Sequence, residues 1–176
     1  MNYYISDLHF GHENIIRLTN RPFNNIKEMN DTLIKNWNKR VKVEDTVYII
    51  GDLFFKSLEN VENILRVLKG KKYLILGNHD KTWIDTIDKD LYFEEVTELL
   101  TIDDGERMIT LCHYPMVSFE GRFHIHGHIH GNTNDVFWNT LKSMDKVLNA
   151  GVEVNGFRPV TFNELLINNR KFKEEH

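Results

Sequence analysis

Several features that mark other classes of protein are scarce or missing in this sequence of 176 residues. It has one cysteine, Cys112, which excludes an intrachain disulfide framework and fits a reducing compartment. No apolar run approaches the ~20 residues that a membrane-spanning helix needs, and the first residues lack the basic and apolar regions of a signal peptide. We therefore expect a cytoplasmic protein that does not span a membrane.

An excess of positive charge is also missing. The 22 lysine and arginine residues are outnumbered by 26 aspartate and glutamate residues, so the formal net charge is −4. The sequence thus lacks the basic signature of proteins that bind long nucleic acids. Its apolar fraction of 41% and charged fraction of 27% are typical of globular proteins. Because a chain of this length buries enough surface for one core, we expect a single domain over residues 1–176.

Short apolar runs alternate with longer periodic segments in the first half of the chain. The short runs are rich in aromatic and β-branched residues, which predicts buried strands at residues 3–5, 47–50 and 73–76. Segments 25–41 and 57–69 repeat apolar residues every three or four positions, which predicts helices, the second with Ser57 as its N-cap. This order predicts parallel strands joined by right-handed crossovers.

The second half of the chain has a different pattern. Segments 96–103 and 106–113 flank Asp104-Gly105, a dipeptide typical of the type I′ turn of a β-hairpin. Runs 123–126 and 147–150 predict two further strands. Parallel strands followed by antiparallel ones indicate two sheets, or one mixed sheet, with helices outside.

The remaining segments predict one helix and two loops. Thr161 and Glu164 have the spacing of a capping box, so we expect the last helix to begin there. Segments 114–122 and 131–145 lack a clear period, and each follows a histidine-containing motif. We expect both to be loops around a functional site.

Histidine is unusually clustered. The chain has nine histidines, and all but His176 fall into four short groups. These groups are His9 with His12; His79; His113; and His124, His126, His128 and His130. Histidines that cluster beside Asp, Asn and Gly indicate metal ligands or acid–base groups.

The predicted parallel strands are each followed by a polar side chain. Asp7, Asp52 and Asn78 come after the three strands, so they should meet at the carboxyl edge of the sheet, where α/β proteins bind ligands. His9 lies two residues after Asp7, and an alternating backbone would direct both side chains the same way.

The later histidines extend this set. His113 ends a predicted strand, and His128 and His130 follow another with the same two-residue spacing. Two aspartates, one asparagine and four histidines are too many ligands for one divalent ion and suit two ions that share a carboxylate. Oxygen and nitrogen donors without thiolate favour Mn, Fe or Zn.

Five blocks in this chain resemble those of calcineurin-like metallophosphoesterases. The blocks are Asp7-Leu8-His9, Gly51-Asp52, Gly77-Asn78-His79-Asp80, His113 and Gly127-His128-Ile129-His130. The resemblance looks closest to a compact bacterial and phage subgroup with one domain, which shares segments 7–16, 21–23 and 154–160. It implies an α/β fold, a layered α-β-β-α sandwich with two mixed β-sheets.

The resemblance also implies a dinuclear metal centre that hydrolyses phosphate esters. The implied ligands of the first ion are Asp7, His9, Asp52 and His130, and those of the second are Asp52, Asn78, His113 and His128. The expected ions are Mn, Fe, Zn or Ni, with Mn favoured, and a hydroxide that bridges them would attack phosphorus. His79 is the candidate general acid and Asp80 the carboxylate that orients it.

Other polar residues are candidates for substrate binding or for packing. His12, Arg21 and Arg122 can contact a phosphate, with plain packing or surface roles as the alternatives. We interpret His124 and His126 as structural or as supporting the ligands from behind, on the same strand face as His128.

The expected substrate is a small phosphate ester such as a nucleotide. We favour phosphodiesters because the Gly-Asn-His-Asp block looks like that of small prokaryotic phosphodiesterases and because no cluster of arginines is evident for a dianionic monoester. The alternatives are a phosphomonoesterase or nucleotidase, a nuclease acting on short nucleic acids, and a non-catalytic scaffold of the same fold.

Overall fold

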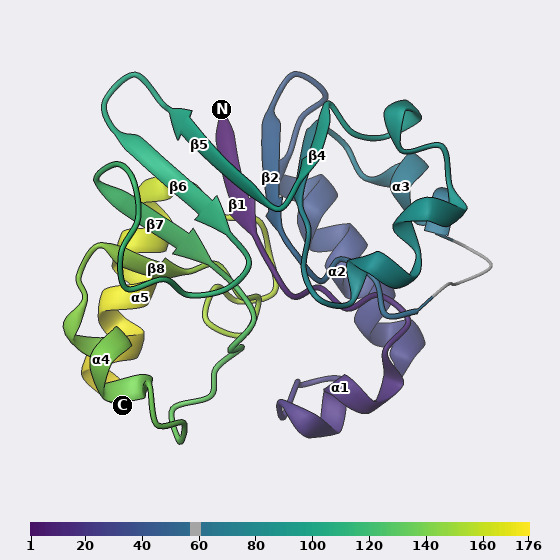
Figure 1. Ribbon diagram of the computed structural model, residues 1–176. Helices are drawn as coiled ribbons and strands as arrows, with labels where there is room; N and C mark the ends of the chain where they lie inside the picture. The colour runs from purple at the N-terminus through teal and green to yellow at the C-terminus, as the bar shows by residue number, and fades with distance from the viewer. Residues whose placement is uncertain (57–60) are drawn as a thin grey trace.

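The computed structural model describes residues 1–56 and 61–176, in which two four-stranded sheets lie between two groups of helices (Figure 1). The first sheet has the order β1-β2-β3-β4 and all its pairs are parallel. Its strands are β1 (Asn2–Ile5), β2 (Thr46–Ile50), β3 (Lys71–Ile75) and β4 (Glu95–Thr97). The three predicted parallel strands are therefore confirmed.

The second sheet has the order β5-β6-β7-β8. Its strands are β5 (Leu99–Asp103), β6 (Met108–Cys112), β7 (Phe123–His126) and β8 (Val147–Asn149). The β5–β6 pair is antiparallel and the other two pairs are parallel, so this sheet is mixed. The α/β fold class with two sheets is confirmed, although only one sheet is mixed.

Helices cover the outer side of each sheet (Figure 1). The group beside the first sheet is α1 (Glu13–Leu18), α2 (Ile26–Arg40) and α3 (Val61–Val67), and the group beside the second is α4 (Trp138–Ser143) and α5 (Phe162–Glu175). Single turns of 3₁₀ helix at Asp80–Thr82, Ile84–Thr86 and Lys89–Leu91 connect β3 to β4. Among the described residues, no helix is long and apolar enough to cross a membrane.

The alternation of side chains along β1 explains this layering. Tyr3 and Ile5 point into a core shared with α2 and α3, where Trp37 is fully buried. Tyr4 points the other way, into a second core that contains Ile50 of β2 and Ile125 of β7. Because the first sheet is apolar on both faces, it must be covered by helices on one side and by the second sheet on the other.

The predicted helix starts agree with the structure where it describes them. Asn25 caps α2 by accepting a hydrogen bond from the backbone of Glu28, and the capping box of Thr161 and Glu164 begins α5. Ser57, the predicted N-cap of α3, lies outside the described residues. The prediction that 131–145 is entirely loop is wrong, because α4 lies within it.

The observed structure differs from the predicted hairpin in two respects. The segment 96–103 is split into β4 and β5, which belong to different sheets. The turn is a four-residue loop, since Asp103 pairs with Met108, and only Gly105 within it has a positive φ, at +87°. A type I′ turn needs two such residues. Instead, the Asp104 carboxylate accepts hydrogen bonds from the backbone of Glu106 and Arg107 and shapes the loop.

Candidate metal centre

The predicted ligands lie just beyond the carboxyl ends of five strands. β1 leads to Asp7 and His9, β2 to Asp52, β3 to Asn78, β6 to His113, and β7 to His128 and His130. Contacts between their side chains show that the structure brings all seven to one place.

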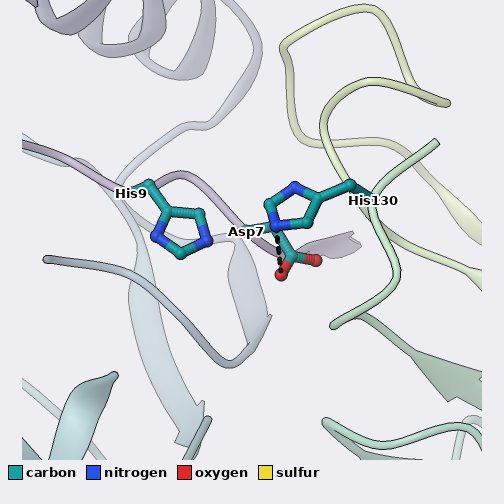
Figure 2. A group of neighbouring side chains, drawn as sticks. All are labelled: Asp7, His9 and His130. Atoms are coloured by element: carbon teal, nitrogen blue, oxygen red, sulfur yellow. Dashed lines mark ion pairs between the residues drawn. The ribbon is translucent and has the colours of Figure 1, made fainter. Parts of the chain in front are cut away.

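Three overlapping groups, drawn from these ligands and from His79, can hold a metal ion. The groups are Asp7 with His9 and His130 (Figure 2); His9 with Asp52 and His79; and Asp7 with Asp52 and His113. Within each group the ligand atoms lie within 4.8 Å of one another. The groups share Asp7, His9 and Asp52, so the arrangement is one extended centre rather than separate sites.

A further set of donor atoms surrounds Asn78. Its Oδ1 lies 3.2 Å from Nε2 of His113 and 3.0 Å from Nδ1 of His128. The same Nε2 of His113 lies 3.5 Å from Oδ2 of Asp52. Ligand atoms that each lie about 2.1 Å from one ion are about 3.0–3.4 Å apart, so this set has the spacing of one coordination sphere.

His9 shows most clearly that the centre fits a cation. Its side chain is buried, and neither ring nitrogen has a hydrogen-bond partner among the described residues. Burial lowers the pKa of His9 to about 2, against the opposing charge of Asp52, so the imidazole is neutral. A buried polar group without a partner is unfavourable. A neutral ring nitrogen 3.5 Å from the Asp52 carboxylate is a suitable metal ligand.

Asp52 and His113 form a charged pair in this centre. Burial by itself raises the pKa of Asp52, but the hydrogen bond and charge of His113 outweigh it and bring that pKa to about 2. Burial likewise opposes the charged form of His113, yet the bond to Asp52 and the charge of Asp7 raise the pKa of His113 to about 9. His113 also donates from Nδ1 to the Ile50 carbonyl, which leaves Nε2 facing Asp52.

The backbone at the centre is not the extended chain that we expected. Five of the predicted ligands have left-handed φ values between +50° and +71°: Asp7, His9, Asp52, His128 and His130. Such a conformation is uncommon outside glycine and costs about 1–3 kcal/mol per residue. Hydrogen bonds between the loops hold it, such as that from the backbone of His9 to the Asp52 carbonyl at 3.0 Å. The side chains therefore converge through turns, and the prediction of alternation along an extended chain is wrong.

The glycines of the motifs make room for these side chains. A Cβ atom on Gly51 would collide with the His113 ring, and one on Gly77 would collide with the Asp52 carboxylate. A Cβ atom on Gly127 would collide with the Ser6 hydroxyl, which donates to Asp7 Oδ2 at 2.7 Å. The glycines are thus required for close approach between the loops.

Asp80 does not orient His79, contrary to the prediction. Its buried carboxylate accepts hydrogen bonds from the backbone of Asp52, Leu53 and Gly77, and from Trp83 Nε1. In the described structure none of its hydrogen bonds goes to the imidazole of His79. Asp80 instead ties together the two loops that carry Asp52 and Asn78.

His79 and His12 both lie beside the centre. The His79 side chain is 34% exposed, and its Nε2 is 4.0 Å from Asp52 Oδ2. The His12 ring stacks on Phe55 with centroids 3.6 Å apart and lies 5.4 Å from the His9 ring. Nδ1 of His12 is buried and has no partner among the described residues. Both rings thus border the centre.

The structure contradicts the predicted phosphate contacts of Arg21 and Arg122. The Arg21 guanidinium is buried and donates to the backbone carbonyls of Asp7 and Leu8, so it supports the first loop from behind. Arg122 is exposed and precedes β7, whose opposite end leads to His128. The strand β7 therefore lies between Arg122 and the turn that carries His128.

His124 and His126 are buried side chains of β7. The ring nitrogens of His124 face the carbonyl oxygens of Thr110 and Tyr114, at 3.0 and 3.1 Å. β7 ends at His126, and the left-handed conformation of His128 directs the chain away from the strand. The prediction that His128 shares their strand face is therefore wrong.

Glu153 lies beside the centre but was not among the candidate residues predicted from the sequence. Its Oε1 accepts hydrogen bonds from Nδ1 of His130 at 3.0 Å and from Nη2 of Arg21 at 2.7 Å. Although burial favours its neutral form, these two partners bring the pKa of Glu153 to about 2. The available signal was a carboxylate just after the predicted strand 147–150, at the same edge as the other ligands.

Comparisons with known proteins place the chain in a family. No protein-family model matches the sequence. The uncharacterised protein MJ1445 of Methanocaldococcus jannaschii is 38% identical over 164 residues, which cover 90% of this chain and 85% of that protein. This chain belongs to the MJ1445 family.

Other relatives of this MJ1445-family chain come from a bacterium and a phage. The crystal structure of AQ665, a protein of unknown function from Aquifex aeolicus, has a TM-score of 0.72 and 30% identity, and the match covers 93% of this chain and 96% of that one. The Gene 66 protein of Mycobacterium phage L5 is 29% identical over 161 residues, covering 73% of this chain and 76% of that protein.

A more distant structure shares the fold. Nuclease MPE of Pseudomonas putida matches with a TM-score of 0.51 and 21% identity, over 73% of this chain and 60% of that chain. At this identity the match shows a common fold for the MJ1445-family chain and the nuclease.

Proposed function

We propose that this chain is a metal-dependent phosphoesterase of the calcineurin-like type, with a centre for two divalent ions. One observation carries the proposal: Oδ2 of Asp52 lies 3.5 Å from Nε2 of His9 on one side and 3.5 Å from Nε2 of His113 on the other. A single carboxylate oxygen placed between two sets of ligands is the arrangement that two ions need in order to share it. Mn is the favoured ion, with Fe, Zn and Ni as alternatives.

Each side chain has a role in this proposal. Asp7, His9, Asp52 and His130 would hold the first ion, and Asp52, Asn78, His113 and His128 the second. When bound, such ions act as Lewis acids toward a phosphoryl group and lower the pKa of water. His79 is partly exposed at the rim, where its imidazole can give a proton to the departing oxygen of the ester.

Charge supports a phosphodiester as the substrate. A monoester dianion carries one more negative charge than a diester and gains more from additional cations. Of the two arginines that we expected to bind phosphate, Arg21 is paired with Glu153 and Arg122 lies beyond the far end of β7. The fold shared with a nuclease keeps cleavage of short nucleic acids as the second candidate, because nucleases also cleave phosphodiesters.

The test compares two esters with the same leaving group. Metal-free protein is reconstituted with Mn²⁺, and initial rates are measured with bis(p-nitrophenyl) phosphate and with p-nitrophenyl phosphate. We expect hydrolysis to require the metal and to favour the diester in kcat/KM. Asp52→Asn should lower the rate at least ~100-fold, whereas Asp31→Asn, at an exposed position on α2, should not change it.

Two results would contradict the proposal. Faster hydrolysis of the monoester would overturn the diester assignment and favour a phosphatase or nucleotidase. If neither ester is hydrolysed with Mn²⁺, Fe²⁺, Zn²⁺ or Ni²⁺, the enzymatic proposal fails and the scaffold alternative gains support.

A further inference from the structure

A cavity of about 530 Å³ opens beside the centre. His128 and His130 form part of its wall, and the rest comes from residues 18–20, at the end of α1, and from the segment between β7 and α4. Its volume is within the range of about 300–1,000 Å³ that is usual for small-molecule sites. Since two proposed ligands line it, a phosphate at the centre would place one of its ester groups at or inside this cavity.

The walls of the cavity are rich in neutral hydrogen-bonding groups. Asn20 and Asn134 contribute amides and Thr133 a hydroxyl. The amide oxygen of Asn132 accepts a hydrogen bond from the backbone of Asn134, so Asn132 offers its amide nitrogen as a donor. An amide carries both donors and an acceptor, and so can match the mixed edge of a nucleobase. These groups select a ligand that presents several donors and acceptors.

Three apolar side chains, those of Leu18, Ile129 and Phe137, complete the walls. Phe137 is 53% exposed and Leu18 is 63% exposed, so both present apolar surface that the protein itself does not cover. An exposed aromatic ring next to amide groups is a suitable surface for stacking a planar base. A simple sugar or glycerol group would use the amides but would leave the ring surface without a planar partner.

The charge of the cavity argues against an acidic group as its ligand. Asp135 is its one carboxylate, and the described residues that line it include no lysine or arginine. A second phosphate or an acidic group would therefore meet a negative charge without a compensating cation. The group that enters should be uncharged.

We propose that this cavity binds the nucleoside of a phosphodiester substrate whose phosphate lies at the metal centre. This inference rests on the proposed function and adds the chemical class of one ester group. The base would stack on Phe137 and bond to the amide of Asn134 and the amide nitrogen of Asn132, while the sugar would connect it to the phosphate beside His128 and His130.

The experiment compares substrates that differ only in the group retained on phosphorus. Thymidine 5′-(p-nitrophenyl phosphate) and methyl p-nitrophenyl phosphate have the same charge and the same leaving group. With the Mn²⁺-loaded protein, we expect kcat/KM to be at least ~30-fold higher for the thymidine ester. Phe137→Ala and Asn134→Ala should each reduce that ratio at least ~5-fold. The matched control is Asn139→Ala, at an exposed position on α4 outside the cavity, and should leave the ratio unchanged.

A binding measurement separates this inference from the proposed function. Calorimetry with thymidine 5′-monophosphate and 2-deoxyribose 5-phosphate should give a Kd at least ~10-fold lower for the nucleotide, and Phe137→Ala should remove most of the difference. Equal Kd values for the two phosphates would overturn the cavity assignment, as would equal kcat/KM values for the two esters. Failure to hydrolyse either ester would instead contradict the proposed function, and the calorimetric comparison would still decide the role of the cavity.

Discussion

Oε1 of Glu153 accepts a hydrogen bond of 3.0 Å from Nδ1 of His130. This bond fixes the orientation of the ring and leaves Nε2 toward Asp7, at 3.9 Å from its Oδ1. A carboxylate behind a ligating histidine commonly fixes its tautomer and increases its basicity. Arg21 donates to the same carboxylate oxygen and also to the Asp7 carbonyl, so one buried network supports two proposed ligands of the first ion.

The first prediction concerns this network. Glu153→Gln keeps the size of the side chain but removes its charge, so His130 should hold the metal less well. We expect the affinity of the first position for Mn²⁺ to fall ~10–100-fold, as measured by calorimetry. Glu98→Gln, at a surface carboxylate that pairs with Lys81, is the matched control and should have no effect. An unchanged Mn²⁺ affinity in Glu153→Gln would show that the bond to His130 does not support metal binding.

A second prediction tests the role of His79. A general acid matters most for a poor leaving group, because a good one departs without a proton. His79→Asn should therefore slow hydrolysis of alkyl phosphodiesters ~10²–10⁴-fold and of p-nitrophenyl diesters much less, with metal content unchanged. Equal losses with both kinds of ester would assign His79 to phosphate binding instead. Loss of metal from the variant would contradict both roles.

The sequence was sufficient to predict the elements that depend on local patterns. β1, β2 and β3 are short apolar runs, α2 follows an apolar repeat of three or four positions, and α5 begins at a capping box that can be read directly from the chain. The donor groups of the centre were also predictable, because parallel strands bring their carboxyl ends to one edge.

Roles that depend on contacts between distant segments could not be predicted. Arg21 and Glu153 are 132 positions apart, and nothing near Arg21 in the sequence indicates that its charge is already neutralised. Asp80 is adjacent to His79, yet its carboxylate bonds to the backbone of Asp52, which lies on another loop. The left-handed turns at Asp7 and His128 are likewise held by bonds between loops, so an extended chain was the wrong expectation.

A third prediction follows from the pKa of His113, which is raised to about 9 in the metal-free protein. At pH 7 the imidazole is therefore protonated and must lose its proton to bind a metal. The affinity of the second position should increase as the pH rises toward about 9. Calorimetry at pH 7 in two buffers with different ionisation enthalpies measures the protons released, and His113→Gln should release about one fewer than the unmodified protein. If both proteins release the same number of protons, His113 is not the group that loses a proton when the metal binds.

The central claim is that two ions share the Asp52 carboxylate, and the number of ions bound per chain tests it most directly. Mass spectrometry of metal content after equilibration with saturating Mn²⁺ and removal of free ions should give two Mn²⁺ per chain. Asp52→Asn should weaken both positions and bring the ratio well below one, whereas His113→Ala should lower it to about one. A ratio of one or less in the unmodified protein, or two in Asp52→Asn, would contradict a shared carboxylate.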